Sequence, residues 1–566
     1  MDHREPCFQG APDIFKKSSF GTYLAANFEA RQQTGSTLAD MLFNSPIFLF
    51  GFLPATVGLY ILLRQFAGPR AVLGLLLAAS LFFYGWWNPA YLPLLGGIAV
   101  FNFVIARWIT AQRSAGRSGR VRLLLIFGIV VDLTVLGYFK YTDFLIDTAN
   151  TLVHADFMLQ HILLPLGISF FTFQKIAYLV DSSRGQVAEH DFLEYCFFVM
   201  FFPQLLAGPI THHSEIFSQI KDPWAFAIKP SNFMLGLTIF VIGLFKKVVL
   251  ADHFAPMVSS VYDAAAAGQA LDFFTAWQGA IAFKLQLYFD FSGYSEMALG
   301  AARLFGIQLP LNFNSPLRAL NVVDYWRRWH MTLSRWLRDY IYIPLGGSRR
   351  GTRRLYFNLM VTMALSGLWH GAAWHFVLWG SLQGGAMVMN HAWRSVRRPV
   401  NAWWSNTVAR LITFFGLTIV LVTHRAPSMD VAARVFRGMA NLPGSWRHAF
   451  GPFGDALSWL GVRFDGPPVT ADQQELVLWL IVWLAIVWYL PNTQQMLARW
   501  HPAFNYGVAE RERDPPLLER VPSVMRLLPW RLEWQPSAAA AVVVGLLAAL
   551  AFLNLHHVSE FLYFKY

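Results

Sequence analysis

Two histidines in otherwise apolar surroundings are the residues whose chemistry stands out. His370 follows Gly-Leu-Trp and precedes Gly-Ala-Ala at the end of an apolar stretch, and His330 ends the run Asp-Tyr-Trp-Arg-Arg-Trp-His. An imidazole, with a pKa of about 6.5, can take or give a proton at neutral pH. The small residues beside His370 would let another backbone or a substrate approach closely. His370 is therefore the best candidate for a catalytic acid or base, and the alternative is a histidine that only hydrogen-bonds between helices.

The segment around His330 combines charge and aromatic rings. On a continuous helix Trp326, Trp329 and His330 would share one face, because residues three and four apart are neighbours. Such a face could serve a substrate, with Asp324 and Arg327 in support. It could equally be an interfacial helix, with tryptophans at the level of the lipid headgroups and arginines among the phosphates.

An aromatic stretch at 287–297 contains two acids, Asp290 and Glu296, with the hydroxyls of Tyr288 and Ser292 between and beside them. A charged group at the centre of a bilayer costs roughly 2.5–3.5 kcal/mol on insertion scales, so each is a candidate for function. A hydrogen-bonded cluster that fixes helix packing is the alternative. The neighbouring charged stretch at 246–252 is interpreted as a helix end whose lysines extend to the interface.

No metal site or tightly bound cofactor is predicted. His370 and His375 are five residues apart, which turns about 140° on one helix, so they would not chelate one ion as an i, i+4 pair does. The sequence has no phosphate-binding glycine loop. Its two cysteines, Cys7 and Cys196, indicate no disulfide framework.

Composition indicates a membrane protein. Of the 566 residues 55% are hydrophobic, 16% aromatic and only 14% charged. Windows that are apolar and almost free of charge recur along the chain and predict about eleven to thirteen spans, once less distinct ones are added. These windows are 47–63, 71–87, 91–106, 123–139, 233–245, 377–389, 411–422, 476–490 and 538–555.

The net charge of +12 lies in loops between these windows. The segment 327–354 carries eight arginines and one acid, Asp339, and a second cluster of arginines occupies 113–122. Loops of this kind tend to remain cytoplasmic, which explains the charge without nucleic acid. A specific anionic ligand is the other interpretation.

Several spans are interrupted by proline and glycine, at 164–167 and 203–209. Non-helical backbone at membrane depth persists only where protein or a water-filled cavity surrounds it. We therefore expect broken or re-entrant segments around a central funnel. Two polar segments, 425–475 and 491–535, are expected to be loops or interfacial helices.

The run 324–347, together with Leu-Trp-His-Gly-Ala at 368–372, resembles the membrane-bound O-acyltransferase (MBOAT) superfamily. Within this superfamily, the run most resembles the alginate O-acetylation membrane protein group. The segments 165–170, 202–209, 288–294 and 561–564 resemble the same group. The resemblance implies an all-α polytopic fold with a funnel that leads to the key histidine. It places that histidine at His370, beside Trp369, and a second functional histidine at His330, beside Trp329.

The resemblance begins at Met41. Residues 41–566 are thus expected to form one membrane domain with its motif core at 165–380. Residues 1–40 are expected to be a polar N-terminal extension that activity does not need.

By resemblance, bacterial members move an acetyl group from a cytoplasmic donor, acetyl-CoA, across the inner membrane for O-acetylation of an exported polysaccharide such as alginate. A periplasmic acetyltransferase of the SGNH-hydrolase type and the synthesis and export machinery are the implied partners, alongside membrane lipids. Alternatives are cellulose or another exopolysaccharide as acceptor, or D-alanyl transfer to a cell-wall polymer. A conduit without catalysis, with Asp290, Glu296 and His370 as a proton relay, belongs to a different class.

Overall fold

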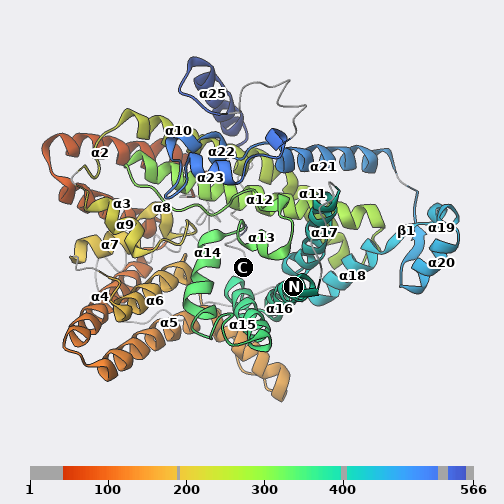
Figure 1. Cartoon of the computed structure of the whole chain (residues 1–566), viewed down its shortest axis with the longest axis horizontal. Helices are drawn as coiled ribbons and strands as arrows, with labels where there is room; N and C mark the ends of the chain where they lie inside the picture. The colour runs from red at the N-terminus through yellow and green to blue at the C-terminus, as the bar shows by residue number, and fades with distance from the viewer. Residues whose placement is uncertain are drawn as a thin grey trace, which may run out of the picture.

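The computed structural model describes residues 42–187, 191–222, 224–396, 404–468, 470–520, 533–555 and 562. The proposed extension 1–40, Met41 and most of the motif at 561–564 therefore lie outside the described residues. The described chain is almost entirely helical (Figure 1). This confirms the all-α polytopic fold predicted from the sequence.

The N-terminal third is a row of long helices, drawn from red to orange in Figure 1. Its elements are η3 (Ile47–Phe52), α2 (Leu53–Phe66), α3 (Pro69–Trp87), η4 (Pro89–Tyr91), α4 (Leu92–Ser114) and α5 (Ser118–Val153). The most apolar window of α5 is only 17% buried inside the protein. A long apolar helix with so little protein around it is suited to contact lipid.

The middle of the chain forms the core. It contains α6 (Ile168–Arg184), α7 (Phe192–Met200), α8 (Phe202–Leu205), α9 (His213–Ile220), α10 (Pro230–Phe245), η5 (Lys246–Ala251), α11 (Asp252–Ala266) and α12 (Phe273–Leu304). Glycines allow α10 and α12 to meet backbone to backbone. A Cβ on Gly243 would lie 2.6 Å from the carbonyl oxygen of Gly293, and one on Gly300 would lie 2.6 Å from that of Gly236.

The motif region packs beside this core. Its elements are η6 (Pro316–Arg318), α13 (Val322–Trp326), α14 (Met331–Leu337), η7 (Arg338–Tyr342), α15 (Thr352–His370), α16 (Trp374–Val396) and α17 (Ser405–Arg425). The short helices α13 and α14 lie near the centre of Figure 1, with α15 and α16 beside them.

The two polar segments contain short helices, and the first also contains one small parallel sheet that the sequence did not predict. The first contains α18 (Met429–Met439), β1 (Asn441–Pro443), α19 (Gly444–Phe450), α20 (Pro452–Trp459) and β2 (Arg463–Gly466). After α21 (Ala471–Tyr489), the second contains α22 (Thr493–Met496), η8 (Ala498–Trp500), α23 (Val508–Arg513) and η9 (Leu518–Arg520), and α25 (Ala538–Leu553) follows.

Each apolar window found in the sequence lies on a helix, but only six helical segments of the described chain are long and apolar enough to cross a bilayer. They are Ile47–Phe66, Pro69–Trp87, Pro89–Ser114, Ser118–Val153, Pro230–Ala266 and Ser405–Arg425. This is fewer than the eleven to thirteen spans expected. The other helices fall short in one of two ways. Helices α12, α15 and α16 are long but not apolar enough, whereas the apolar helices Gln473–Tyr489 and Ala538–Leu553 are shorter.

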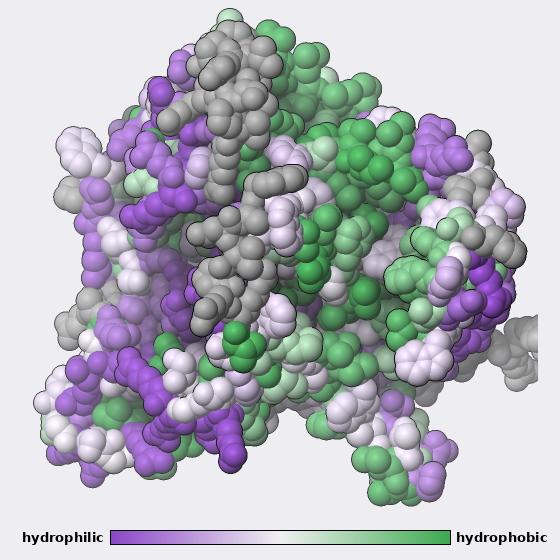
Figure 2. All heavy atoms as spheres, turned by 45° about the vertical axis from the view of Figure 1, so that its right-hand side comes forward, coloured by the Kyte–Doolittle hydropathy of each residue, from purple (hydrophilic) through white to green (hydrophobic). Residues whose placement is uncertain are grey.

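The surface reflects the same division. In Figure 2 apolar side chains gather over the middle and right of the face shown, whereas hydrophilic side chains gather along its left. A broad apolar area bordered by polar regions is expected where a protein contacts lipid.

Candidate active site

The helix expected to run through His330 is broken at that residue. His330 has a φ of 42°, in the left-handed region, and separates α13 from α14. The break is held from outside the segment, because the amide of Met331 donates to the carbonyl oxygen of Asn312 at 2.9 Å, and Thr332 Oγ1 donates to Asn312 Oδ1 at 2.6 Å. The predicted common face of Trp326, Trp329 and His330 is therefore wrong, since tertiary hydrogen bonds override local helix formation.

The break turns the ring of His330 into the protein. The residue is 0% exposed, and its ring centroid lies 4.8 Å from that of Phe291 and 6.1 Å from that of Trp369. Neither ring nitrogen has a hydrogen-bond partner among the described residues. Trp326 and Trp329 are buried as well, at 5% and 7% exposure, which is not the position of headgroup anchors.

His370 ends α15 at the point where α15 and α16 are in closest contact. A Cβ on Gly367 would lie 2.2 Å from the carbonyl oxygen of Phe376, and one on Gly380 would lie 2.2 Å from that of Met363. A Cβ on Gly371 would lie 2.1 Å from the ring of Phe376. The small residues beside His370 thus admit another backbone, that of α16, rather than a substrate.

This packing surrounds His370 with rings. Its centroid lies 5.0 Å from that of Trp369, 4.9 Å from that of Trp379 and 5.7 Å from that of His424, at the end of α17. Helix α5 supports the same end of α15, because Tyr141 donates to the carbonyl oxygen of Leu368 at 3.0 Å. Lys140 donates to the carbonyl oxygen of Trp369. His330 and His370 thus both pack against Trp369.

A small cavity of about 30 Å³ adjoins His370. His424, Lys284, Trp329 and Trp379 also line it, and a space of this size holds about one water-sized group. The Lys284 side chain, on α12, is buried and donates to the carbonyl oxygen of Phe414 at 2.7 Å and to Thr418 Oγ1 at 3.1 Å.

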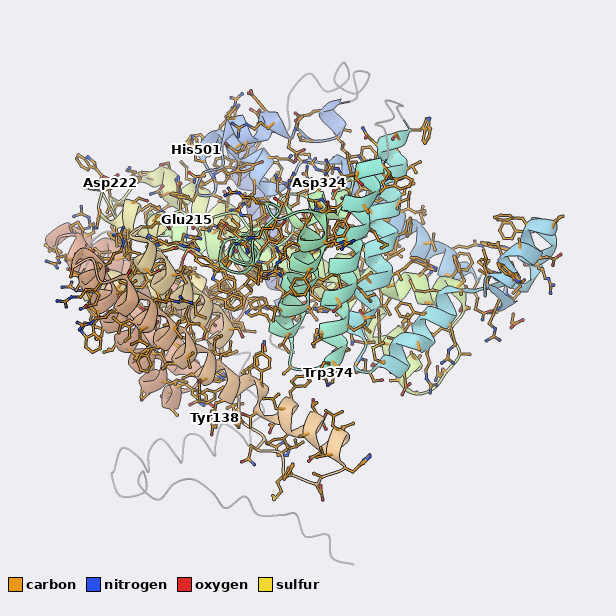
Figure 3. The ribbon with its side chains drawn as sticks, turned by 60° about the horizontal axis from the view of Figure 1, so that its bottom comes forward. Tyr138, Glu215, Asp222, Asp324, Trp374 and His501 are labelled. Carbon is orange, nitrogen blue, oxygen red and sulfur yellow. The ribbon has the colours of Figure 1, made fainter. Side chains whose placement is uncertain are left out.

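A second cavity of about 760 Å³ lies on the arginine-rich side. Arg327, Arg335, Arg338 and Arg513 line it, against two acids, Glu215 and Glu510. Trp326 lines both cavities and so stands between them. Figure 3 shows Glu215 and Asp324 on one side of the protein and Tyr138 and Trp374 on the other.

The four arginines of the larger cavity differ in their pairing. Arg335 is held by both carboxylate oxygens of Glu215, at 2.5 and 2.9 Å, whereas Arg338 pairs with Asp339 and Arg513 with Glu510. Arg327 is exposed and forms no ion pair within the described part of the chain. It is the arginine best able to meet an anionic ligand there.

Asp324 has a supporting position. It accepts from Arg328 Nε at 2.8 Å and from the amide of Leu320 at 3.1 Å. Arg328 in turn binds Asp514, at 2.5 Å, which Arg318 also binds at 2.8 Å. Burial raises the pKa of Asp514, but the hydrogen bonds and charges of these arginines outweigh it and lower that pKa below its usual value. These ion pairs hold the second polar segment, through Asp514, against the motif region.

Asp290 and Glu296 line neither of the two cavities. Asp290 pairs with Lys247 at 2.8 Å, and Glu296 pairs with Lys246 at 2.7 Å, which joins α12 to η5. Asp290 also accepts from the amide of Leu562 at 3.1 Å. Lys247 is 1% exposed, so the expectation that both lysines extend to the interface is wrong for it.

The hydroxyl residues of the same helix are buried too. Tyr288 packs against Phe313, with ring centroids 6.3 Å apart, and Ser292 is 1% exposed. Neither side chain lines the two cavities described above. Of the residues singled out in the sequence, the structure brings together His330, His370, Trp329 and Trp369, with Arg327 at the larger cavity, and places the others in its supports.

Two ionisable residues of the site were missed in the sequence. Lys284 lies in an apolar stretch and His424 at the end of another, followed by Arg425. An ionisable residue in an apolar span is a functional candidate by default, and that rule would have selected both.

Comparison with known proteins identifies the family. Residues 146–423, which include His330 and His370, match the model of the membrane-bound O-acyltransferase family. The chain is 43% identical over 431 residues to the peptidoglycan O-acetyltransferase of Helicobacter pylori, covering 71% of this chain and 80% of that protein. It is 41% identical over 418 residues to the probable alginate O-acetylase AlgI of Pseudomonas aeruginosa, covering 72% and 76%.

A more distant relative carries a different acyl group in its name. The teichoic acid D-alanyltransferase of Streptococcus thermophilus is 29% identical over 257 residues, covering 43% of this chain and 60% of that protein. With its buried histidines and apolar helices, the chain belongs to the membrane-bound O-acyltransferase family and is a multi-pass membrane O-acyltransferase.

Proposed function

We propose that this enzyme takes an acetyl group from acetyl-CoA on the cytoplasmic side of the bacterial inner membrane and passes it on for O-acetylation of an exported polysaccharide. The observation that carries the proposal is the pair of neighbouring cavities that share Trp326 as a lining residue. The larger one is of a size suited to a cofactor-sized ligand, and the smaller one adjoins His370.

The larger cavity suits the donor. Its arginines match the phosphates of coenzyme A, because guanidinium groups bind phosphate oxygens through charge-assisted hydrogen bonds. Arg327 is the residue we assign to this contact, since Arg335, Arg338 and Arg513 already pair with acids. The donor's thioester would extend past Trp326 toward the histidines.

The chemistry at the smaller cavity is acyl transfer. His370 takes the proton from the acceptor hydroxyl as its oxygen attacks the thioester carbonyl carbon. The carbon–sulfur bond breaks, and the thiolate leaves with the proton returned by the imidazole. The Lys284 amine nitrogen, buried beside the same cavity, is placed to donate a hydrogen bond to the carbonyl oxygen as negative charge develops on it.

Our assignment of the acyl group and of the acceptor depends on the names of the relatives. The peptidoglycan and alginate enzymes, at 43% and 41% identity, both carry acetyl in their names, whereas the D-alanyl enzyme is 29% identical. We therefore assign acetyl as the group. An exported polysaccharide such as alginate is our first acceptor, with a periplasmic SGNH-type acetyltransferase completing the transfer, and peptidoglycan is the second because of the Helicobacter relative.

The test is made in the source organism with the gene deleted and then restored. Ester-bound acetate is measured separately on exopolysaccharide and on peptidoglycan. We expect deletion to remove acetate from the exopolysaccharide. Loss from peptidoglycan alone would replace the first acceptor by the second, and loss from neither would overturn the proposed function.

The donor is tested with membranes in vitro. [¹⁴C]Acetyl-CoA is supplied to membrane vesicles whose cytoplasmic face is exposed, and protein-dependent release of coenzyme A is followed. Arg327→Ala should raise the KM for acetyl-CoA about tenfold with little change in kcat, because it removes a binding contact. Arg349→Ala, an exposed arginine that does not line the cavity, is the matched control.

A further inference from the structure

A second group of ionisable side chains lies apart from the histidines of the active site. Asp181, near the end of α6, meets His212 and His213 at the start of α9, and one ligand atom from each lies within 4.8 Å of the others. Asp181 and His213 are buried, and His212 is 21% exposed at its side chain. None of the three belongs to the six apolar spans.

Both imidazoles direct the same nitrogen at the same carboxylate oxygen. His213 Nδ1 lies 3.4 Å from Asp181 Oδ2, and His212 Nδ1 lies 3.6 Å from it. These separations exceed the 2.7–3.2 Å that is usual for an N–H···O hydrogen bond. Two ligands of a tetrahedral Zn²⁺ ion, each about 2.0–2.2 Å from the metal, lie roughly 3.4 Å apart, which the observed distances resemble.

The outer nitrogen of His213 fixes its tautomer. Nε2 lies 3.1 Å from the carbonyl oxygen of Gln186, which can only accept, so Nε2 carries the hydrogen. In a neutral ring Nδ1 then presents a lone pair to the Asp181 oxygen. That nitrogen is buried without a hydrogen-bond partner among the described residues. Histidines that bind a metal commonly donate their other nitrogen in this way.

Tyr340, on η7, completes the surroundings. Its hydroxyl donates to Asp181 Oδ2 at 2.7 Å and lies 3.5 Å from His212 Nε2. Arg184 lies 3.6 Å from the other oxygen of Asp181, and the nearby Arg335 is held by Glu215. The cluster thus turns the lone-pair nitrogen of His213 and Nδ1 of His212 to one carboxylate oxygen, and one metal ion can join these three atoms.

We propose that Asp181, His212 and His213 bind one divalent transition-metal ion, of which Zn²⁺ suits the ligand set best. Two imidazoles and one carboxylate, with the fourth position left to water, form an ordinary zinc ligand set. The sequence-based expectation of no metal site considered His370 and His375, whereas this group joins residues about thirty positions apart.

The ion would stabilise the elements that form one side of the larger cavity. It links the end of α6 to the start of α9, where Glu215 holds Arg335, and through Tyr340 it reaches η7. Glu215, Arg335 and Arg338 line that cavity, and Figure 3 labels Glu215. The ion's role would therefore be to position these elements, independently of which acyl group the enzyme transfers.

The metal content of the purified protein tests the proposal. The full chain is purified in detergent through a tag that contains no histidine, and bound metals are measured by mass spectrometry. We expect about one transition-metal ion per chain, reduced at least tenfold in His213→Gln and in Asp181→Asn. His253→Gln, an exposed histidine on α11, should keep the wild-type content.

A second measurement needs no variant. Wild-type protein stripped by a chelator is titrated with Zn²⁺ while its Tm is recorded, and binding to the folded state should raise the Tm by several degrees. Less than a tenth of an ion per chain, together with a Tm that Zn²⁺ does not change, would overturn the proposal. Equal metal content in wild type and His213→Gln would overturn it as well.

Discussion

At the scale of single residues, the site combines groups that the sequence separates by more than a hundred positions. His370 and His424 lie 5.7 Å apart between ring centroids, both against Trp379, and Lys284 lines the same small cavity. Two imidazoles this close can share a proton-transfer task or set each other's protonation. His424 is therefore a positioning residue for His370 in the proposed mechanism.

Replacing His424 by Phe tests this role. Phe keeps the ring packing against Trp379 and Phe376 but removes both nitrogens, so the protein should accumulate normally. We expect kcat to fall by about tenfold to a hundredfold and its pH profile to shift, because a neighbour of the base is lost. Transfer rate per amount of membrane protein, measured across pH 5.5–8.5 (roughly the range in which His titrates), is the readout.

His375→Phe is the matched control, since His375 lies close in sequence but lines neither cavity. It should retain wild-type rate and pH profile. A His424→Phe enzyme within twofold of wild type, with the same profile, would remove His424 from the site.

At the scale of elements, helices that touch backbone to backbone at glycines hold the histidines in place. Gly367 on α15 and Gly380 on α16 let the two backbones touch next to His370. We expect Gly367→Ala to deplete folded protein in the membrane, because a Cβ 2.2 Å from the carbonyl oxygen of Phe376 forces the helices apart. The amount of tagged protein that stays monodisperse in detergent measures this.

Gly385→Ala is a matched control on α16, where a Cβ would meet nothing within 4 Å. Its yield should equal that of wild type or exceed it, since alanine favours helix. Normal yield and activity for Gly367→Ala would show that the two helices tolerate separation.

The elements also show which features the sequence could predict. Apolar windows predicted the helices well, and the family resemblance selected His330 and His370 before any geometry was known. The break at His330 could not be predicted, because it depends on hydrogen bonds that Asn312 accepts from Met331 and Thr332. The amide of Ile210, across the fold, also donates to Thr332 Oγ1. The ion pair of Asp290 with Lys247 could not be predicted either. It forms between α12 and η5, which approach each other closely at Gly293.

At the scale of the whole molecule, the arginine-rich segment sets the orientation that we expect in the membrane. The larger cavity lies beside the segment 327–354, with its eight arginines and one acid, and such a segment is costly to translocate. We therefore expect the proposed donor side to be the cytoplasmic side. Trp374 and Tyr138, on the opposite side in Figure 3, then face away from the donor.

Cysteine labelling at Ser348 tests this orientation. Ser348 is exposed, and a Ser348→Cys variant should react with a membrane-impermeant maleimide only after the cells are opened. Cys7 is first replaced by Ser, and Cys196 is buried and should give little background. Labelling of intact cells would place the arginine segment outside and would contradict acetyl-CoA binding in the larger cavity.

The most direct test of the central claim, that His370 transfers the proton in acyl transfer, is the activity of His370→Ala. Polymer-bound acetate is measured in cells that express the variant and normalised to the tagged protein in the membrane, with His375→Ala as control. Loss of a general acid or base lowers rate by about 100-fold to 10,000-fold, so acetylation should fall at least a hundredfold at near-normal protein levels. Near-normal acetylation at normal protein levels would contradict the claim and make His330 the leading candidate.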